Sequence, residues 1–102
     1  MIGRMWRGWT SAAAADAYEN LLRGTIFPAI QRIDGSRGAY LLRRDVENEV
    51  AFVTLTLFDS LEAVRAFAGD DSTLAVIEPE ARRLLSRFDE RAVHYEVAIE
   101  PG

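Results

Sequence analysis

The single histidine, His94, is the first candidate for chemistry because no other side chain in the sequence has an ordinary pKa near neutrality. The sequence contains no cysteine, which excludes a thiolate nucleophile, thiolate metal sites and disulfides. A neutral imidazole can take a proton from a phenol or an enol at pH 7, so His94 is our candidate catalytic base. The alternative is a structural histidine, hydrogen-bonded to Tyr95, Glu96 or a backbone carbonyl, or placed at a subunit interface.

Aromatic and cationic residues provide the candidate binding groups. Trp6 and Tyr18 could form the wall of a pocket for a flat substrate, and Trp9 could do so if its face of the strand is the enclosed one. Arg4 and Arg43 lie in predicted strands and could hold an anionic substrate. The alternatives are core or interface packing for the aromatic residues, and ion pairs or solvated side chains for the arginines.

The acidic residues do not form a pattern typical of a metal site. Asp70 and Asp71 follow a predicted helix end, and Glu78 and Glu80 flank Pro79 at a predicted helix start. The glycine-rich segment 34–38 precedes a strand, whereas phosphate loops follow one. We therefore expect no metal, no nucleotide and no bound cofactor.

Composition limits the class of protein. A chain of 102 residues with 49% hydrophobic residues predicts one globular domain, residues 1–102. The net charge is -4 and the twelve arginines are scattered, so we expect no nucleic-acid partner. Arginines interrupt the apolar N-terminus, which excludes a signal peptide or membrane span there. A cytoplasmic protein is the default expectation, and the absence of lysine is typical of a GC-rich bacterial genome.

Hydrophobic periodicity predicts seven elements in the order β-α-β-β-α-α-β. Thr10-Ser11 and Asp59 are the expected N-caps of the first two helices, and Gly69 is the expected C-cap of the second. Gly24 is expected to interrupt the first helix. The predicted strands are residues 2–9, 39–45, 50–58 and 92–99, and the predicted helices are residues 12–23 with a short turn at 27–33, 61–68 and 79–88.

This order predicts an α+β fold, the ferredoxin-like split βαβ arrangement with a four-stranded antiparallel sheet. Strand 50–58 is apolar on both faces, whereas helices can cover only one face of the sheet. We therefore expect a homodimer in which two sheets pack face to face as a dimeric α+β barrel. Side chains in the last strand alternate between two faces, one with Val93 and Tyr95 and the other with His94. The face with Val93 and Tyr95 is the more apolar and is expected to pack against the helices, so this alternation (parity) predicts that His94 points away from them.

Several segments together resemble the antibiotic biosynthesis monooxygenase (ABM) family. They are Ile2-x-Arg4-x-Trp6-x-Gly8, Ala17-Tyr18-Glu19, Leu41-Leu42-Arg43-Arg44, Phe52-Val53-Thr54, residues 60–69 and His94-Tyr95-Glu96-Val97. The resemblance covers nearly the whole chain. It implies the dimeric α+β barrel, with a pocket between helices and sheet in each subunit. Characterised relatives include cofactor-independent oxygenases that oxidise polycyclic phenols to quinones, and haem-degrading enzymes.

Two functions follow as hypotheses. The first is a cofactor-independent monooxygenase acting on a small aromatic or polyketide-like compound, with His94 as base. The second is a non-catalytic, dimeric ligand-binding or stress-associated protein. Haem binding or degradation is the less favoured alternative, because the haem-degrading members of the family use a helix-borne histidine and His94 is predicted on a strand.

Overall fold

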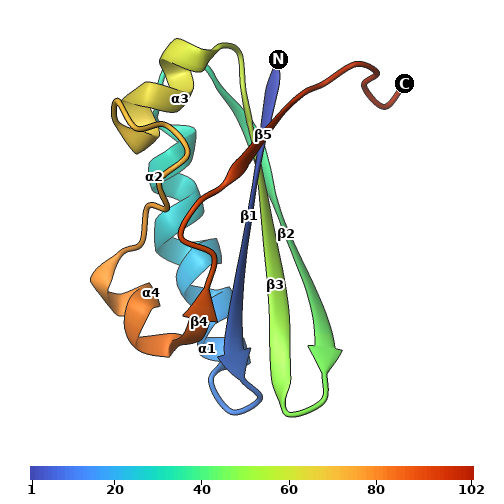
Figure 1. Cartoon of the computed structure of the whole chain (residues 1–102), viewed down its shortest axis with the longest axis vertical. Helices are drawn as coiled ribbons and strands as arrows, with labels where there is room; N and C mark the ends of the chain where they lie inside the picture. The colour runs from blue at the N-terminus through green and yellow to red at the C-terminus, as the bar shows by residue number, and fades with distance from the viewer.

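The computed structural model describes residues 1–102 as one antiparallel sheet with helices on one face (Figure 1). The long central strands β1 and β3 pair over their whole length, from Ile2 opposite Phe58 to Ser11 opposite Glu49. The sheet order is β2-β3-β1-β4, and β5 also pairs with β1. The strands are β1 Ile2–Ser11, β2 Ser36–Val46, β3 Glu49–Phe58, β4 Leu85–Phe88 and β5 Val93–Glu96.

The predicted α+β class is confirmed, but five strands form the sheet where four were expected. β4 pairs with the Gly8–Thr10 end of β1, and β5 pairs with the Ile2–Met5 end. The two short strands therefore occupy successive parts of one edge. The sheet is four strands wide, as the split βαβ arrangement requires.

The helices lie together on one side of the sheet (Figure 1). Two of them follow β1 and are joined by a π-helical turn, η1, so that the chain stays helical through Gly24 rather than being interrupted there. The helical segments are α1 Ala15–Leu21, η1 Leu22–Ile26, α2 Phe27–Gln31, α3 Leu61–Ala68 and α4 Pro79–Leu84. None of them is long and apolar enough to cross a membrane.

The last helix is shorter than predicted. Ala81, Leu84, Leu85 and Phe88 have helical spacing, but the backbone becomes extended at Leu85, with φ -79° and ψ 131°. Residues 85–88 then pair with β1, with Phe88 opposite Gly8. Sheet hydrogen bonds with a distant strand thus replace those of the last helical turns, a tertiary effect that local periodicity does not contain.

The helix caps differ in detail from the prediction. α1 begins at Ala15, and Ser11 caps the preceding turn by accepting a hydrogen bond at Oγ from the Ala14 amide, at 3.2 Å. Ser60, and not Asp59, is the N-cap of α3, where its Oγ accepts from the Ala63 amide at 3.2 Å. The Asp59 carboxylate instead pairs with Arg37. Gly69 ends α3 as predicted, with φ +84°.

The core fills the space between helices and sheet. One cluster joins Tyr18 and Leu22 to Phe52, and a second joins Ile30 and Val64 to Phe58. All of the strand residues in these clusters point to the helix side, which fixes the two faces of the sheet.

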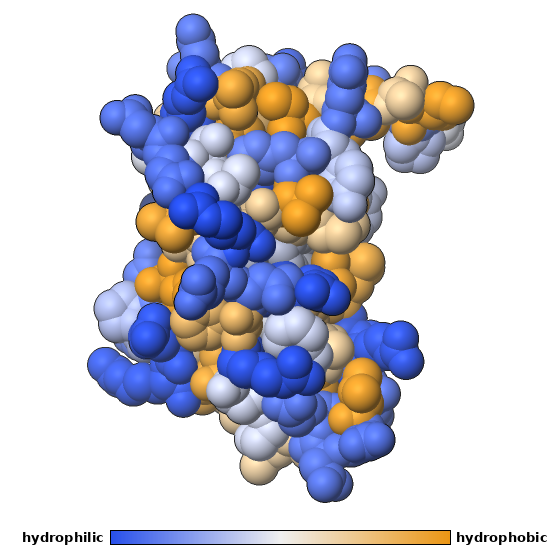
Figure 2. Space-filling model, viewed as in Figure 1, coloured by the Kyte–Doolittle hydropathy of each residue, from blue (hydrophilic) through white to orange (hydrophobic).

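The opposite face of the sheet has no helix over it. A row of apolar side chains crosses it through paired positions, from Tyr40 through Leu55 and Met5 to Val93. Tyr40, Leu42, Val93 and Tyr95 on this face are each more than half exposed. Hydrophobic side chains are visible along the strand side of the molecule in Figure 2, between charged ones. Strand β3 is therefore apolar on both faces, as its sequence predicts.

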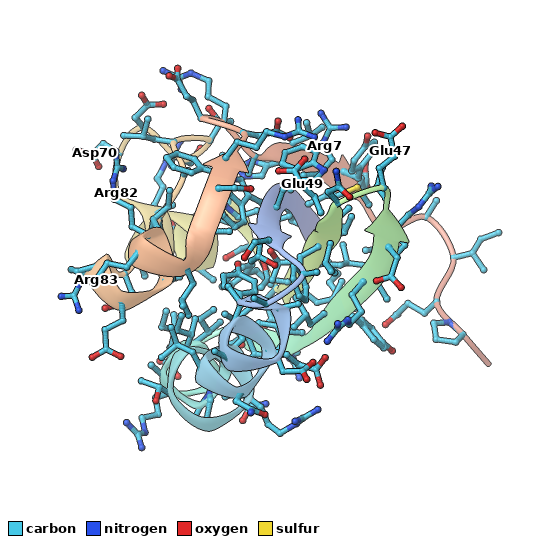
Figure 3. All side chains as sticks on the ribbon, turned by 90° about the horizontal axis from the view of Figure 1, so that it is seen from below. Arg7, Glu47, Glu49, Asp70, Arg82 and Arg83 are labelled. Carbon is cyan, nitrogen blue, oxygen red and sulfur yellow. The ribbon has the colours of Figure 1, made fainter.

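Charged side chains are concentrated at the periphery. Figure 3 shows Arg83 pointing outward from α4, and Asp70 and Arg82 on the same flank of the molecule. Arg7 and Glu49 are both on the open face of the sheet, in paired positions opposite Val53 and Ser11. Of these, Arg7 pairs with Asp89 and Glu49 pairs with Arg87. These exposed pairs contribute little to stability individually.

Candidate functional site: a cavity between helices and sheet

A cavity of about 300 Å³ lies between the helices and the sheet. This volume is at the lower end of the range for small-molecule sites. Eleven of its sixteen lining residues are hydrophobic. The lining residues are Arg4 and Trp6 of β1, Thr54 and Thr56 of β3, Tyr18, Leu22, Thr25, Ile26, Phe27, Ala29, Ile30 and Ile33 of the first helical region, and Phe67, Val76, Glu78 and Ala81 of the later segments.

The π-helical turn η1 forms much of the helix wall. Leu22, Thr25 and Ile26 all come from this turn, which is directly followed by Phe27 of α2. A π turn rotates the residues that follow it relative to a regular α-helix, and such turns are frequent at functional sites. The irregular backbone and the cavity therefore occur at the same place.

Arg4 provides the cationic group of the cavity. Arg4 is 5% exposed, and its guanidinium Nη2 donates a hydrogen bond to the Leu74 carbonyl at 2.8 Å. The guanidinium also lies 5.2 Å from the centre of the Phe67 ring. Burial lowers the pKa of Arg4 to about 10, so the side chain is still charged at neutral pH.

Trp6 lines the cavity with its ring only. The indole Nε1 donates to the Asp89 carbonyl at 2.6 Å, so this donor is occupied and is not available to a ligand. Gly8 lies beside the ring, since a Cβ there would come within 3.2 Å of Trp6 Cη2. The indole is thus held in place as a flat apolar wall.

Tyr18 of α1 reaches the cavity from the helix side. The residue is 2% exposed, and its ring packs 4.7 Å from that of Phe52. Burial raises the pKa of Tyr18 to about 12, so its hydroxyl is neutral at physiological pH. The hydroxyl makes no hydrogen bond within the chain, which leaves it able to donate to or accept from a ligand.

His94 lies on the helix side of the sheet, which corrects the parity prediction. It is paired directly with Arg4 across β5 and β1, and paired side chains share a face. His94 does not itself line the cavity, and its Nε2 is buried without a hydrogen-bond partner. Burial, and then the charge of Arg4, lower the pKa of His94, whereas a hydrogen bond to the Ser72 backbone acts in the opposite direction.

The parity prediction failed because β5 is covered differently from a central strand. The segment leading to Leu74 folds over the helix side of β5, with the Ala92 amide donating to the Thr73 carbonyl at 2.6 Å. That segment accommodates the polar His94, whereas the apolar Val93 and Tyr95 lie on the open face.

Trp9 and Arg43 lie outside the cavity. Trp9 is on the open face of the sheet, where the guanidinium of Arg87 lies 4.0 Å from the centre of its ring system. Arg43 is on the helix side but forms ion pairs with Asp16 and Glu19, at 3.1 and 2.8 Å. The structure therefore brings Arg4, Trp6 and Tyr18 together, with His94 adjacent, and separates the other two candidates from them.

Sequence reasoning missed several cavity residues. Thr54 and Thr56 share a strand face with Phe52 and Phe58, so alternation alone could have placed them there. The residues of η1, and Val76 and Glu78 in the segment before α4, have no comparable local signal. Their position depends on how the helical region crosses the sheet.

Several solved structures share this fold over the whole length of the chain. No protein-family model matches the sequence, and no curated protein matches it either. A protein of Deinococcus radiodurans described as a candidate antibiotic biosynthesis monooxygenase superposes with a TM-score of 0.68 at 17% identity, over 100% of this chain and 97% of the other. This chain has the fold of the antibiotic biosynthesis monooxygenases.

Two further structures with the antibiotic biosynthesis monooxygenase fold were solved with ligands. A monooxygenase of Streptomyces coelicolor in complex with nanaomycin D has a TM-score of 0.59 at 17% identity, over 99% of this chain and 92% of the other. The haem degrader MhuD of Mycobacterium tuberculosis, with two haems in its active site, has a TM-score of 0.63 at 19% identity and covers both chains fully. In these two neighbours the fold holds nanaomycin D and haem, respectively.

Proposed function

We propose that this protein is a monooxygenase-like enzyme that oxidises a small aromatic or polyketide-like compound in the cavity, without a bound cofactor. The observation that carries the proposal is the cavity itself, which is apolar and contains a fixed indole, a free tyrosine hydroxyl and one buried cation. A flat phenol fits these features, with its ring against Trp6 and its oxygen toward Arg4 or Tyr18. The ligand of the Streptomyces coelicolor neighbour, nanaomycin D, supports this choice of compound class.

Molecular oxygen is the only co-reactant that the proposed reaction needs. A phenol with a free para position reacts with O₂ to give a quinone and one water. One atom of O₂ becomes the new carbonyl oxygen, and the other leaves as water with the phenolic hydrogen and the para hydrogen. The electron-rich phenolate is the form that reacts with O₂, so the enzyme must remove the phenolic proton and stabilise the negative charge.

His94 and Arg4 are the proposed groups for this step. Burial and the charge of Arg4 lower the pKa of His94, so its imidazole is neutral at pH 7 and can accept a proton. Its Nε2 has no hydrogen-bond partner, and the residue is paired across the sheet with Arg4, the one cation of the cavity. Arg4 would stabilise the oxyanion that forms. Tyr18 would orient the substrate through its hydroxyl, and Trp6 would fix the plane of the ring.

The second candidate is a ligand-binding protein without catalysis. It is favoured by one observation, namely that His94, the only histidine of the chain, does not line the cavity. Under this alternative the same cavity binds an aromatic ligand, and the buried His94 is structural.

We also propose a homodimer. The open face of the sheet presents a row of apolar side chains in paired positions, through Tyr40, Leu55, Met5 and Val93, and Tyr40 and Val93 are each more than half exposed. Exposed apolar patches are typical of interaction surfaces. A second copy packed face to face would cover this row and produce the dimeric α+β barrel. Size-exclusion chromatography with light scattering tests this, and a stable monomer at micromolar concentration would exclude it.

Oxygen uptake with hydroxynaphthalenes and anthrones tests the enzymatic proposal. We expect uptake above the uncatalysed rate, one quinone formed per O₂, and a loss of about 10²-fold or more in kcat for His94→Asn. Arg83→Gln, an exposed substitution on the outer side of α4, is the matched control. Binding of these compounds without uptake would instead establish the non-catalytic alternative, and equal rates for His94→Asn and the wild type would remove His94 from the mechanism.

A further inference from the structure

Arg4 differs from the other arginines in having a buried charge and no carboxylate partner. It is the one buried arginine among twelve. Six exposed or half-exposed arginines form ion pairs with aspartate or glutamate, and Arg4 is not among them. The six are Arg7, Arg23, Arg37, Arg43, Arg87 and Arg91.

The donors of Arg4 are only partly used. Nη2 donates to the Leu74 carbonyl, while Nε is buried and has no acceptor. Nη1 makes no hydrogen bond within the chain. A buried guanidinium without a counter-ion is costly to the folded protein, and a partial contact with the Phe67 ring does not neutralise it.

The surroundings of the cavity do not supply the missing anion. Glu78 is the one acidic side chain of its lining; it is exposed and forms no ion pair with Arg4. The hydroxyls of Thr54 and Thr56 donate to the backbone carbonyls of Trp6 and Arg4, at 3.4 and 3.3 Å. The cavity is therefore an apolar space with a single positive group in its wall.

We propose that the ligand of this cavity is a small aromatic acid whose carboxylate pairs with Arg4 while its ring lies against Trp6 and Phe67. The inference rests on the proposed function, since an acid of this class that also carries a phenolic hydroxyl would be the compound that is oxidised, with its carboxylate on Arg4 and its phenolic oxygen toward Tyr18. A carboxylate is ionised throughout the physiological pH range, whereas a phenol with a pKa near 10 is not. The planar guanidinium also matches a carboxylate in shape.

The size of the cavity limits the acid. A volume of about 300 Å³ is small for a binding site, so one or two fused rings are appropriate. We therefore choose 2-naphthoate as the probe and 2-naphthamide as its neutral counterpart of nearly the same shape.

Isothermal titration calorimetry with these two probes tests the proposal. We expect the wild type to bind 2-naphthoate at least ~10-fold more tightly than 2-naphthamide, the preference expected from a charge-assisted hydrogen bond. In Arg4→Met the two probes should bind equally. In Arg4→Lys, which keeps the charge but not the planar fork, an intermediate preference is expected, and the exposed control Arg83→Gln should match the wild type.

Each outcome has a separate meaning. Equal binding of acid and amide by the wild type, or a preference that survives in Arg4→Met, overturns the inference. Should Arg4→Met fail to fold, as judged by circular dichroism, the wild-type comparison and Arg4→Lys still decide the matter. Binding of neither probe overturns the cavity as a ligand site, and the proposed function with it. Oxygen uptake with neutral phenols, together with equal probe binding, overturns only the requirement for an acid.

Discussion

Arg4 of β1 and His94 of β5 are paired directly across the sheet edge, and both side chains lie on its helix-covered face. The guanidinium lines the cavity, and the imidazole lies beside it with Nε2 buried and unpartnered. A fixed positive charge next to a histidine disfavours protonation of the imidazole. This pair connects the electrostatics of the cavity to the only side chain with an ordinary pKa near neutrality.

The first prediction is that Arg4 controls the pKa of His94. Burial and the Arg4 charge both lower the pKa of His94 below 6.5. Arg4→Met removes the second cause and should raise it. Because the chain has a single histidine, the imidazole proton resonances in an NMR titration report this pKa without overlap. An unchanged midpoint in Arg4→Met, alongside an unchanged midpoint in the control Arg83→Gln, would show that the side chains of Arg4 and His94 do not interact.

The second prediction concerns stability at mildly acidic pH. A histidine whose pKa is lower in the folded state than in the unfolded state binds fewer protons when folded, so the free energy of unfolding rises with pH in that window. This contribution is complete above pH 6.5 and is lost as the pH falls through the folded-state pKa. Urea unfolding of the wild type between pH 7 and 5 should show the loss, and His94→Gln should show less of it.

Acidic residues change the free energy of unfolding at a lower pH than His94 does, so the two contributions can be measured separately. Hydrogen bonds from arginines lower the pKa of Asp59 and Asp71 below their ordinary value of 3.8. Their contribution to stability is present above that value and is lost at more acidic pH. A His94→Gln curve that coincides with the wild type above pH 5 would contradict the second prediction.

The third prediction separates the ring of Tyr18 from its hydroxyl. The ring is buried against Phe52, so Tyr18→Ala should lower the free energy of unfolding by about 3 to 5 kcal/mol, as for other large aromatic truncations. Tyr18→Phe keeps the ring and removes a hydroxyl with no partner in the chain, so its stability should change by less than about 1 kcal/mol. If the hydroxyl orients the substrate, Tyr18→Phe should still reduce oxygen uptake; unaltered kinetics would assign Tyr18 to the core alone.

The fourth prediction concerns the open face of the sheet. Leu42→Arg places a charge in the apolar face and should convert the proposed dimer into monomers. Leu61→Arg is the control, because Leu61 is an exposed leucine at the start of α3 on the other side of the molecule. Light scattering should report half the mass for Leu42→Arg and the wild-type mass for Leu61→Arg. The same mass for Leu42→Arg and the wild type would mean that this face is not the interface.

The fifth prediction compares two glycines with positive φ. At Gly35, with φ +88°, an added Cβ would come within 2.7 Å of the Ala63 Cβ. At Gly38, with φ +118°, an added Cβ would meet nothing within 4 Å. Gly35→Ala therefore combines backbone strain with a clash and should cost about 1 to 3 kcal/mol more than Gly38→Ala in the free energy of unfolding. Equal losses measured by urea unfolding would rule out the clash with α3.

Local signals in the sequence were sufficient for most elements. The alternation in residues 50–58 and the turn before them predict the β2–β3 hairpin, and Gly69 ends α3 where expected. The helical spacing of Leu85 and Phe88 wrongly predicted that the last helix includes them, because their backbone pairs with β1. The choice between helix and strand there depends on hydrogen bonds to a strand almost eighty residues earlier, which no local window contains.

The sequence by itself determined the α+β class and the doubly apolar β3, because these depend on composition and periodicity along the chain. It also named Arg4, Trp6 and Tyr18 as candidate binding residues, since a strand arginine and large aromatic residues are recognisable by type. Only the tertiary structure decided that these three share a cavity, that Trp9 and Arg43 do not, and that His94 faces the helices beside Arg4. The reason is physical: the face of an edge strand and the partners of a charge are set by which distant segments cover them.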